Sequence, residues 1–309
     1  MATVNTLTTK GHPTLTVEAS KREFKTGLEA RIAARANELT SFTSGQAPSH
    51  LQANLIVLPS RYAADFRDLC ARNPVPCPLL AESCVPGDFE KLKSHLQAVP
   101  SGDKIAADLD LRSDCPRFNV YEDSKLKEDG VLDIKSYWTP DHVAFLIGCS
   151  YSFESALCSA GLPPRHFVMN RNVAMYRTSI PLNPAGVFTG STYVVSMRPY
   201  KKVDVPKIRA ITRGYLATHG ECLAWGWDAL RKLGIDDIDN PQWGDAPLAL
   251  DGRPLGQMMG DEENVPVFWG CGVTPQEAVM RAGLEGTVMG HAPGRMLVLD
   301  CLEEDILVQ

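Results

Sequence analysis

Apolar residues along the chain fall into short continuous runs in some segments and into helical spacings in others. Three runs have the length of a strand: Gln52–Leu58, Val143–Gly148 and Tyr193–Met197. Helical spacing recurs over Ser20–Glu38, Arg61–Arg72, Pro206–Leu216 and Trp227–Leu233. Phe118–Tyr121 and Val131–Ile134 flank a polar segment that contains glycine, a pattern that predicts a hairpin. Together these patterns predict a protein of the α/β class.

An internal repeat is the most informative pattern, because Phe145–Leu162 resembles Phe268–Leu284. Each copy has an apolar strand, a Gly-Cys pair, a hydroxyl residue three places after the cysteine, and an amphipathic helix ending in Ala-Gly-Leu. Ser152 and Thr274 are the predicted N-caps, and Thr274–Glu277 has the pattern of a capping box. Both copies therefore predict strand–turn–helix units with the cysteine at the corner.

The two corners predict a shared binding site. Free N–H groups and the positive end of a helix dipole favour a carboxylate or an oxyanion, and ligands in open α/β sheets bind at strand ends. We expect Cys149 and Cys271 to line this pocket with lowered thiol pKa values. Ser150, Ser152, Thr274 and Gln276 would supply polar contacts to the substrate. The alternative is two well-capped βα units with no shared pocket.

Two further segments contain several polar and charged side chains that could bind or act on a substrate. Arg171–Thr178 contains two guanidiniums, an amide and a phenol, and either Arg171 or Arg177 could clamp a carboxylate. An extended segment would place both arginines on one side, and Asn172 and Tyr176 on the other. The alternative is a solvated strand edge.

The second segment is His291–Arg295, on a Pro-Gly turn before an apolar run. Its histidine could carry a proton and its arginine could bind an anion, although a purely structural turn has the same spacing. His166 and His219 have no partner motif, and we interpret them as structural.

Composition excludes several classes of protein. The chain has 309 residues with 31 Lys and Arg against 37 Asp and Glu, a net charge of −6 that argues against a nucleic-acid partner. No apolar run is long enough to cross a membrane. Nine cysteines, an odd number, without a secretory signal predict reduced thiols.

Neither GxGxxG nor a P-loop is present, so we expect no cofactor. No CxxC or HExxH pattern predicts a metal site, but a loosely held divalent metal stays open because acidic ligands need no fixed spacing.

The domain organisation follows from these segments. Residues 1–19 are expected to form a flexible N-terminal arm. Residues 20–170 and 263–309 predict a three-layer main α/β domain built from strand–turn–helix units. Residues 171–262 predict a smaller inserted α+β domain with two layers.

Several of these segments together resemble the DUF1445 family of hydro-lyases, which includes the mitochondrial D-glutamate cyclases. The similar segments are Arg31–Leu39, Gln52–Leu55, Asn73–Leu80, Phe145–Glu154, Arg171–Thr178, Val195–Pro199, Cys271–Gln276 and His291–Met296. Met289-Gly290 departs from the Ile/Thr-type residues of the family, and Arg295 stands where histidine is common. The resemblance implies a two-domain α/β protein that eliminates water from a small carboxylate, as in the closure of D-glutamate to 5-oxo-D-proline.

The expected mechanism is that of a cofactor-independent carbon–oxygen lyase. Arg171 or Arg177 would hold the α-carboxylate, His291 would carry the proton with help from Tyr176, and the amides after Cys149 and Cys271 would bind the oxyanion. Two alternatives stay open, a dehydratase or cyclase acting on a larger biosynthetic intermediate and a non-catalytic carboxylate-binding protein. We expect a cytoplasmic protein, with the mitochondrial matrix as the alternative, and homo-oligomerisation stays open.

Overall fold

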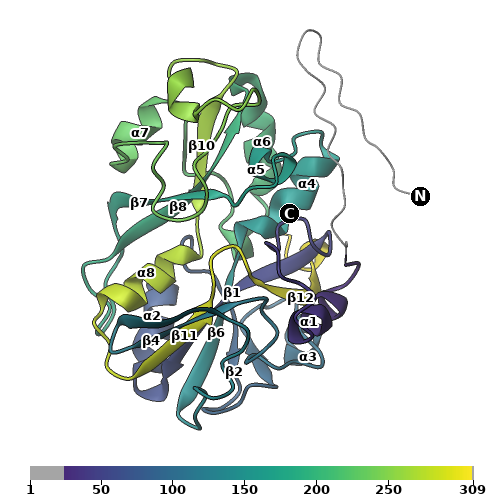
Figure 1. Ribbon diagram of the computed structural model, residues 1–309, viewed down its shortest axis with the longest axis vertical. Helices are drawn as coiled ribbons and strands as arrows, with labels where there is room; N and C mark the ends of the chain where they lie inside the picture. Colours follow the sequence, from purple (N-terminus) through teal and green to yellow (C-terminus); the bar gives the residue numbers. More distant parts are fainter. Residues whose placement is uncertain (1–23, 308–309) are drawn as a thin grey trace.

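The computed structural model describes residues 24–307, so the predicted arm at residues 1–19 lies outside the described residues. Two β-sheets and several short helices make up the fold, which confirms the mixed α/β class (Figure 1). No helix within residues 24–307 combines the length and the apolar character that crossing a membrane requires.

The first sheet has strand order β3-β2-β6-β1-β11-β4-β5, and β12 also pairs with β1. Its strands are β1 (His50–Pro59), β2 (Leu79–Ser83), β3 (Leu92–Ser94), β4 (Phe118–Glu122), β5 (Lys125–Val131), β6 (His142–Gly148), β11 (Thr287–His291) and β12 (Leu297–Leu302). Neighbouring strands of this sheet pair in the antiparallel sense. β1 pairs with β6 from Ala53↔Gly148 to Pro59↔His142. The other edge of β1 is shared by β11 and β12, so the turn between these two strands lies beside the centre of the sheet.

The second sheet has the order β7-β8-β10-β9 and is also antiparallel. It comprises β7 (Ala174–Pro181), β8 (Thr192–Tyr200), β9 (Ala224–Trp225) and β10 (Val265–Gly270). β10 lies outside the 171–262 range of the predicted insertion, yet it hydrogen-bonds along β8 from Val265↔Tyr200 to Gly270↔Val195. A division of the chain into two domains stays a prediction.

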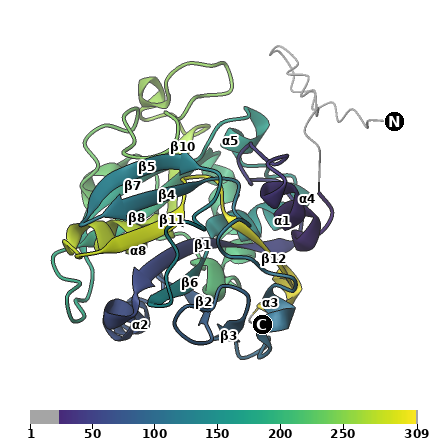
Figure 2. The same cartoon turned by 60° about the horizontal axis from the view of Figure 1, so that its bottom comes forward.

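The helices are short. They are α1 (Gly27–Arg35), α2 (Ala63–Arg72), α3 (Gly102–Ile105), α4 (Glu154–Ser159), α5 (Arg165–Val168), α6 (Val205–Thr212), α7 (Asp228–Leu233) and α8 (Val273–Arg281). Helix α7 ends at Leu233, the last residue of the predicted range, and its C-cap Gly234 has a φ of 70° in the left-handed region that favours glycine. Helix α8 lies between β8 of the second sheet and β11 of the first in Figure 1, and Figure 2 shows it beside the same two strands. Its side chains bond to both sheets, through Thr274 to Val194 on β8 and through Gln276 to His291 on β11.

Strand β1 divides its side chains between two cores because successive residues of a strand point to opposite faces. Leu55 and Val57 belong to the largest hydrophobic cluster, whereas Ile56 and Leu58 belong to a second cluster with residues of α2 and α8. The largest cluster also contains Val267 and Trp269 of the second sheet, so one apolar core joins the two sheets.

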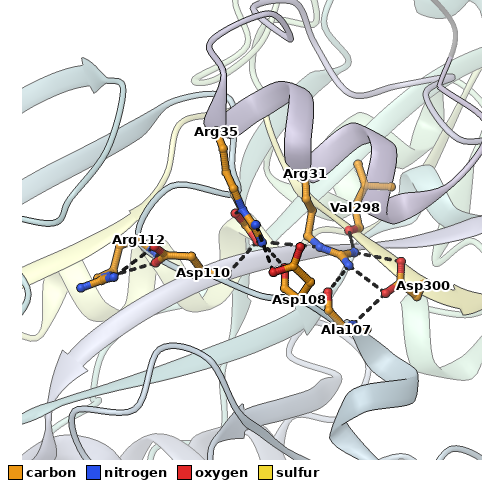
Figure 3. Close-up of polar contacts among 9 residues, drawn as sticks. Arg31, Arg35, Ala107, Asp108, Asp110, Arg112, Val298 and Asp300 are labelled. Carbon is orange, nitrogen blue, oxygen red and sulfur yellow. Dashed lines mark hydrogen bonds and ion pairs between the residues drawn. The ribbon is translucent and has the colours of Figure 1, made fainter.

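Two arginines attach α1 to the first sheet (Figure 3). The Arg31 guanidinium is fully buried and donates to Val298 O at 2.9 Å and to Asp300 Oδ2 at 2.7 Å. Arg35, one helical turn later, pairs with Asp114. Because both side chains leave the same face of the helix, they hold it against β12 and the 107–114 segment.

Candidate functional site

The repeat forms two strand–turn–helix units, as predicted. β6 leads through a 3-10 turn at Ser150–Phe153 into α4, and β10 leads directly into α8. The predicted caps are wrong. Helix α8 has Gly272 at its N-cap, while Thr274 Oγ1 accepts the Val194 N–H at 2.9 Å. Ser152 Oγ accepts the Gln52 N–H at 3.0 Å. The hydroxyls of Thr274 and Ser152 therefore link their corners to neighbouring strands and do not cap helices.

The two corners lie together, but no open cleft separates them. The thiols of Cys149 and Cys271 belong to one buried apolar cluster, which also contains Tyr151, Val173, Met175, Val194, Val273 and Met296. Asn54 joins the corners, since its Nδ2 donates to Gly148 O at 3.1 Å and its side chain occupies the space beside Gly272. The prediction of a cleft between the corners is therefore wrong, because apolar side chains fill that space.

The expected lowering of the two thiol pKa values is also wrong. Burial raises the pKa of Cys271 to about 11, and it raises the pKa of Cys149 further. The N–H groups of Val273 and Tyr151 point at these sulfurs and oppose the effect, but burial outweighs them. Both thiols are thus neutral at neutral pH, and the two N–H groups are already engaged within their own corners.

Open space lies farther out, between the turn that follows β11 and the segment around Trp243–Leu248. One pocket there, of about 400 Å³, is termed the arginine pocket. It is lined by Phe42, Arg117, Asp129, Gly130, Asn172, Gly244, Asp245, Ala292, Pro293 and Arg295. Pro293 also lines a pocket of about 70 Å³, termed the His291 pocket. Asn172 and Asp245 also line a pocket of about 20 Å³, termed the His166 pocket.

The arginine pocket has two guanidiniums without acidic partners. Within residues 24–307 neither Arg117 nor Arg295 has a carboxylate oxygen within 4.0 Å. Arg295 Nε is buried and has no hydrogen-bond partner among the described residues, and its guanidinium carbon lies 5.1 Å from the centre of the Phe42 ring. Burial, and then the charge of Arg117, lower the pKa of Arg295. An anion in this pocket would relieve both effects.

Asn172 connects the pocket to the rest of the fold. Its Oδ1 accepts the Tyr151 hydroxyl at 2.8 Å, and its backbone N–H donates to Asp245 Oδ2 at 2.7 Å. Gly294 packs against it, because an added Cβ would lie 2.8 Å from either polar atom of the amide. The Asn172 amide is thereby fixed at the border of the arginine and His166 pockets.

His291 ends β11 and lines the neighbouring pocket with Gln276. Its Nδ1 lies 3.2 Å from the Leu55 nitrogen and 3.0 Å from Gln276 Nε2. Burial lowers the pKa of His291 to about 4, so the ring is neutral at neutral pH. A neutral ring can exchange a proton with a substrate only if it charges briefly during the reaction.

The remaining predicted residues lie apart from the arginine pocket. Arg177 Nη2 pairs with Glu277 at 2.7 Å, so its guanidinium already has a carboxylate. Tyr176 is fully buried on the other face of β7 and donates to Ile238 O at 2.5 Å. Ser150 Oγ accepts from Arg198 Nη2 at 3.1 Å. Arg171 lines the His166 pocket.

The prediction from sequence found Asn172 and Arg295 but missed three charged residues of the same pocket. Arg117 precedes β4, Asp129 lies on β5 and Asp245 belongs to an irregular segment, so no spacing relates them. Within residues 24–307 there is no group of three or more His, Cys, Asp or Glu side chains arranged to hold a metal ion.

Comparison with known proteins places the chain in a family. A family model described as D-glutamate cyclase matches residues 143–300. A Schizosaccharomyces pombe protein named "putative hydro-lyase" is 41% identical over 283 residues, which are 91% of this chain and 86% of that protein. A Bordetella pertussis protein of the same description is 44% identical over 276 residues, covering 89% of this chain and 90% of that protein.

These relatives, together with the family model, define the class of the chain as that of the hydro-lyases, enzymes that eliminate water. The chain belongs to the D-glutamate cyclase family. Among solved structures, a nitrogen repressor-like protein from Methanococcus jannaschii is 11% identical and covers 89% of this chain and 96% of its own, with a TM-score of 0.36. That similarity is too weak to inform either fold or function.

Proposed function

We propose that the chain closes D-glutamate to 5-oxo-D-proline and water, and that the substrate binds in the arginine pocket. The observation that carries the proposal is the pair Arg117 and Arg295 in a polar pocket of about 400 Å³, two guanidiniums that form no ion pair with a carboxylate within residues 24–307. A dicarboxylate needs such donors, and a planar guanidinium binds a carboxylate through two parallel hydrogen bonds.

The other lining groups suit the rest of the substrate. D-Glutamate carries an ammonium group, and Asp245 and Asp129 are the acidic side chains of the pocket. The Asn172 amide would bind one carboxylate oxygen at the border of the pocket. His291 and Gln276 would limit the length of the substrate from the adjoining pocket, with which the arginine pocket shares Pro293.

The reaction balances without a cofactor. The amine nitrogen attacks the distal carboxyl carbon, a C–N bond forms, and one C–O bond of that carboxyl breaks. The ammonium group loses two protons in total, and both end on the departing oxygen, which leaves as water. The protein must therefore hold the chain of the substrate bent and move protons from nitrogen to oxygen.

The compartment is part of the same proposal. Seven of the nine free thiols are buried, and free thiols suit the reducing cytoplasm or, as the alternative, the mitochondrial matrix. A homo-oligomer is compatible with this assignment.

The test is incubation of the purified chain with D-glutamate, followed by mass detection of a product lighter by one water. L-Glutamate is the matched control, since it has the same charges and the opposite configuration. We expect product from the D form and less of it after Arg295→Gln. Binding of D-glutamate without turnover would favour the carboxylate-binding alternative. Absence of binding would favour a larger intermediate as substrate.

A further inference from the structure

A second histidine, predicted to be structural, belongs to a buried charged cluster beside the arginine pocket. His166 Nε2 lies 3.1 Å from Glu154 Oε1, and Arg198 Nη2 lies 2.5 Å from the same oxygen. Ser44 Oγ donates to Glu154 Oε2 at 2.8 Å. His166 is 8% exposed and Arg198 is fully buried, so the cluster is shielded from water.

The carboxylate of this cluster is charged. Burial alone would raise the pKa of Glu154, but the charges and hydrogen bonds of His166 and Arg198 lower it to about 2. The Glu154 carboxylate lies against His166 Nε2 and accepts a hydrogen bond from the N–H there, which leaves Nδ1 as the ring nitrogen that can exchange a proton in the pocket. The same carboxylate stabilises the ring once it is protonated, as in carboxylate–histidine pairs that transfer protons.

The free nitrogen of the ring has no hydrogen-bond partner in the part of the chain that the structure describes. His166 Nδ1 is buried and lacks a hydrogen-bond partner within residues 24–307, and the same holds for Arg171 Nε. Both residues line the His166 pocket. Buried polar atoms without partners are rare, and two in one pocket point to a ligand that the protein is built to receive.

The size of the pocket and its two free atoms define that ligand. Its volume of about 20 Å³ is close to the roughly 10–15 Å³ that one water needs. A single hydroxyl or water oxygen can donate to a lone pair on Nδ1 and accept from the Arg171 Nε–H. The pocket adjoins the arginine pocket through Asn172 and Asp245, so an oxygen of a substrate bound there can reach it.

We propose that His166 is the proton carrier of the reaction and that the His166 pocket receives the oxygen that leaves as water. This inference rests on the proposed function. His166 Nδ1 takes the two protons of the substrate nitrogen one at a time and delivers each to the departing oxygen, so the ring is unchanged after one turnover. Arg171 Nε–H holds that oxygen, and Glu154 is a positioning residue that orients the ring. His291 is less suited to this role, because among the described residues no carboxylate lies within 4.0 Å of its ring to stabilise the protonated form, as Glu154 does for His166.

His166→Gln is the sharpest variant. The glutamine amide nitrogen can take the place of Nε2 beside Glu154, while the free ring nitrogen is lost. We expect turnover of D-glutamate to fall by roughly 10²-fold or more. The KM should stay close to that of the wild type, and the thermal midpoint should not change. The matched control is His95→Gln, since His95 Nε2 also pairs with a buried carboxylate, Glu82, at 3.2 Å, but lines none of the three pockets. Turnover of His166→Gln at the wild-type rate would overturn the assignment.

A second measurement works without turnover. In the wild-type chain, ¹⁵N spectra of the histidine rings should show His166 Nδ1 without a proton, and added acetate should shift it. Arg171→Gln should abolish that shift. Unmoved His166 signals, or a proton on Nδ1, would overturn the inference even if a variant fails to fold. If acetate shifts His166 but D-glutamate gives no product, the proposed substrate is wrong and the ligand site at His166 stands.

Discussion

The side-chain amide of Asn54 fills the space beside Gly272, with Nδ2 only 1.9 Å from the position of a Cβ added to that glycine. The same Nδ2 donates to Gly148 O, in the other copy of the repeat. One side chain on β1 therefore sets the distance between the two corners. Glycine is required at position 272 by this close approach and not by its φ of −65°, which any residue can adopt.

Gly272→Ala should destabilise the fold. The added methyl group must displace Asn54, so we expect a loss of roughly 1–3 kcal/mol in the free energy of unfolding, as for other overpacked sites. Urea unfolding measures this loss. In the double variant Asn54→Ala/Gly272→Ala the clash is absent, so the combined loss should be smaller than the sum of the single losses. Strictly additive losses would contradict contact between the two residues.

Arg295→Lys should weaken substrate binding. An ammonium group keeps the charge but loses the planar pair of donors, and a hydrogen bond to a charged group contributes roughly 1.5–3 kcal/mol. The KM for the substrate should therefore rise by roughly tenfold or more, with a smaller change in kcat. Arg253→Lys is the control, because Arg253 pairs with Asp251 and lines none of the three pockets. An unchanged KM in Arg295→Lys would exclude this arginine as the carboxylate clamp.

The free energy of unfolding should decrease as the pH is lowered from about 6.5 to 4. Burial lowers the pKa of both His219 and His291 to about 4, whereas a histidine in the unfolded chain titrates near 6.5. In this window the unfolded chain binds protons that the folded chain excludes, so each histidine costs up to roughly 1.4 kcal/mol per pH unit as the pH falls. Above pH 6.5 neither histidine binds a proton on unfolding, so they no longer make the free energy of unfolding depend on pH.

Urea unfolding at several pH values measures this slope. His219→Asn combined with His291→Gln should flatten it, since asparagine tolerates the φ of 83° at position 219. A slope that persists in the double variant would show that other groups cause it.

Thiol reagents should leave the activity intact at early times. Cys84 is exposed, whereas Cys149 and Cys271 are buried thiols whose pKa values burial raises. We expect Cys84 to react first, and the two corner cysteines to react only as fast as the protein unfolds. Labelling followed by peptide mass analysis checks the order, and Cys84→Ser should remove the early product. Rapid modification of Cys271 with loss of activity would contradict this expectation and would indicate that its thiol takes part in the reaction.

Local patterns predicted the elements well where a strand is a continuous buried apolar run or a helix has apolar residues at helical spacing. Gln52–Leu58 lies within β1, Arg61–Arg72 contains α2, and both copies of the repeat form strand–turn–helix units. The second strand of the predicted hairpin is displaced, since β5 ends at Val131, where the expected strand begins. The polar Lys125–Gly130 segment pairs with β4 along an edge of the sheet, a position that tolerates polar residues.

The site was harder to predict because distant partners decide what each polar group can do. Thr274 has the local pattern of a cap but bonds Val194, 80 positions away in the sequence. Arg177 has the chemistry of a clamp but meets Glu277, 100 positions away. Arg117 and Asp245 reach the arginine pocket from separate segments, and such a juxtaposition leaves no spacing in the sequence.

The apolar core that contains Leu55 of β1 and Trp269 of β10 ties the melting of one sheet to that of the other. Heat should therefore disrupt both sheets in a single calorimetric transition, and the space between them should collapse at the same temperature. A molecule held between Arg295 and Asn172 contacts the turn between β11 and β12 and the segment that leads into β7. Its binding energy therefore raises the temperature of that common transition and does not protect one half alone.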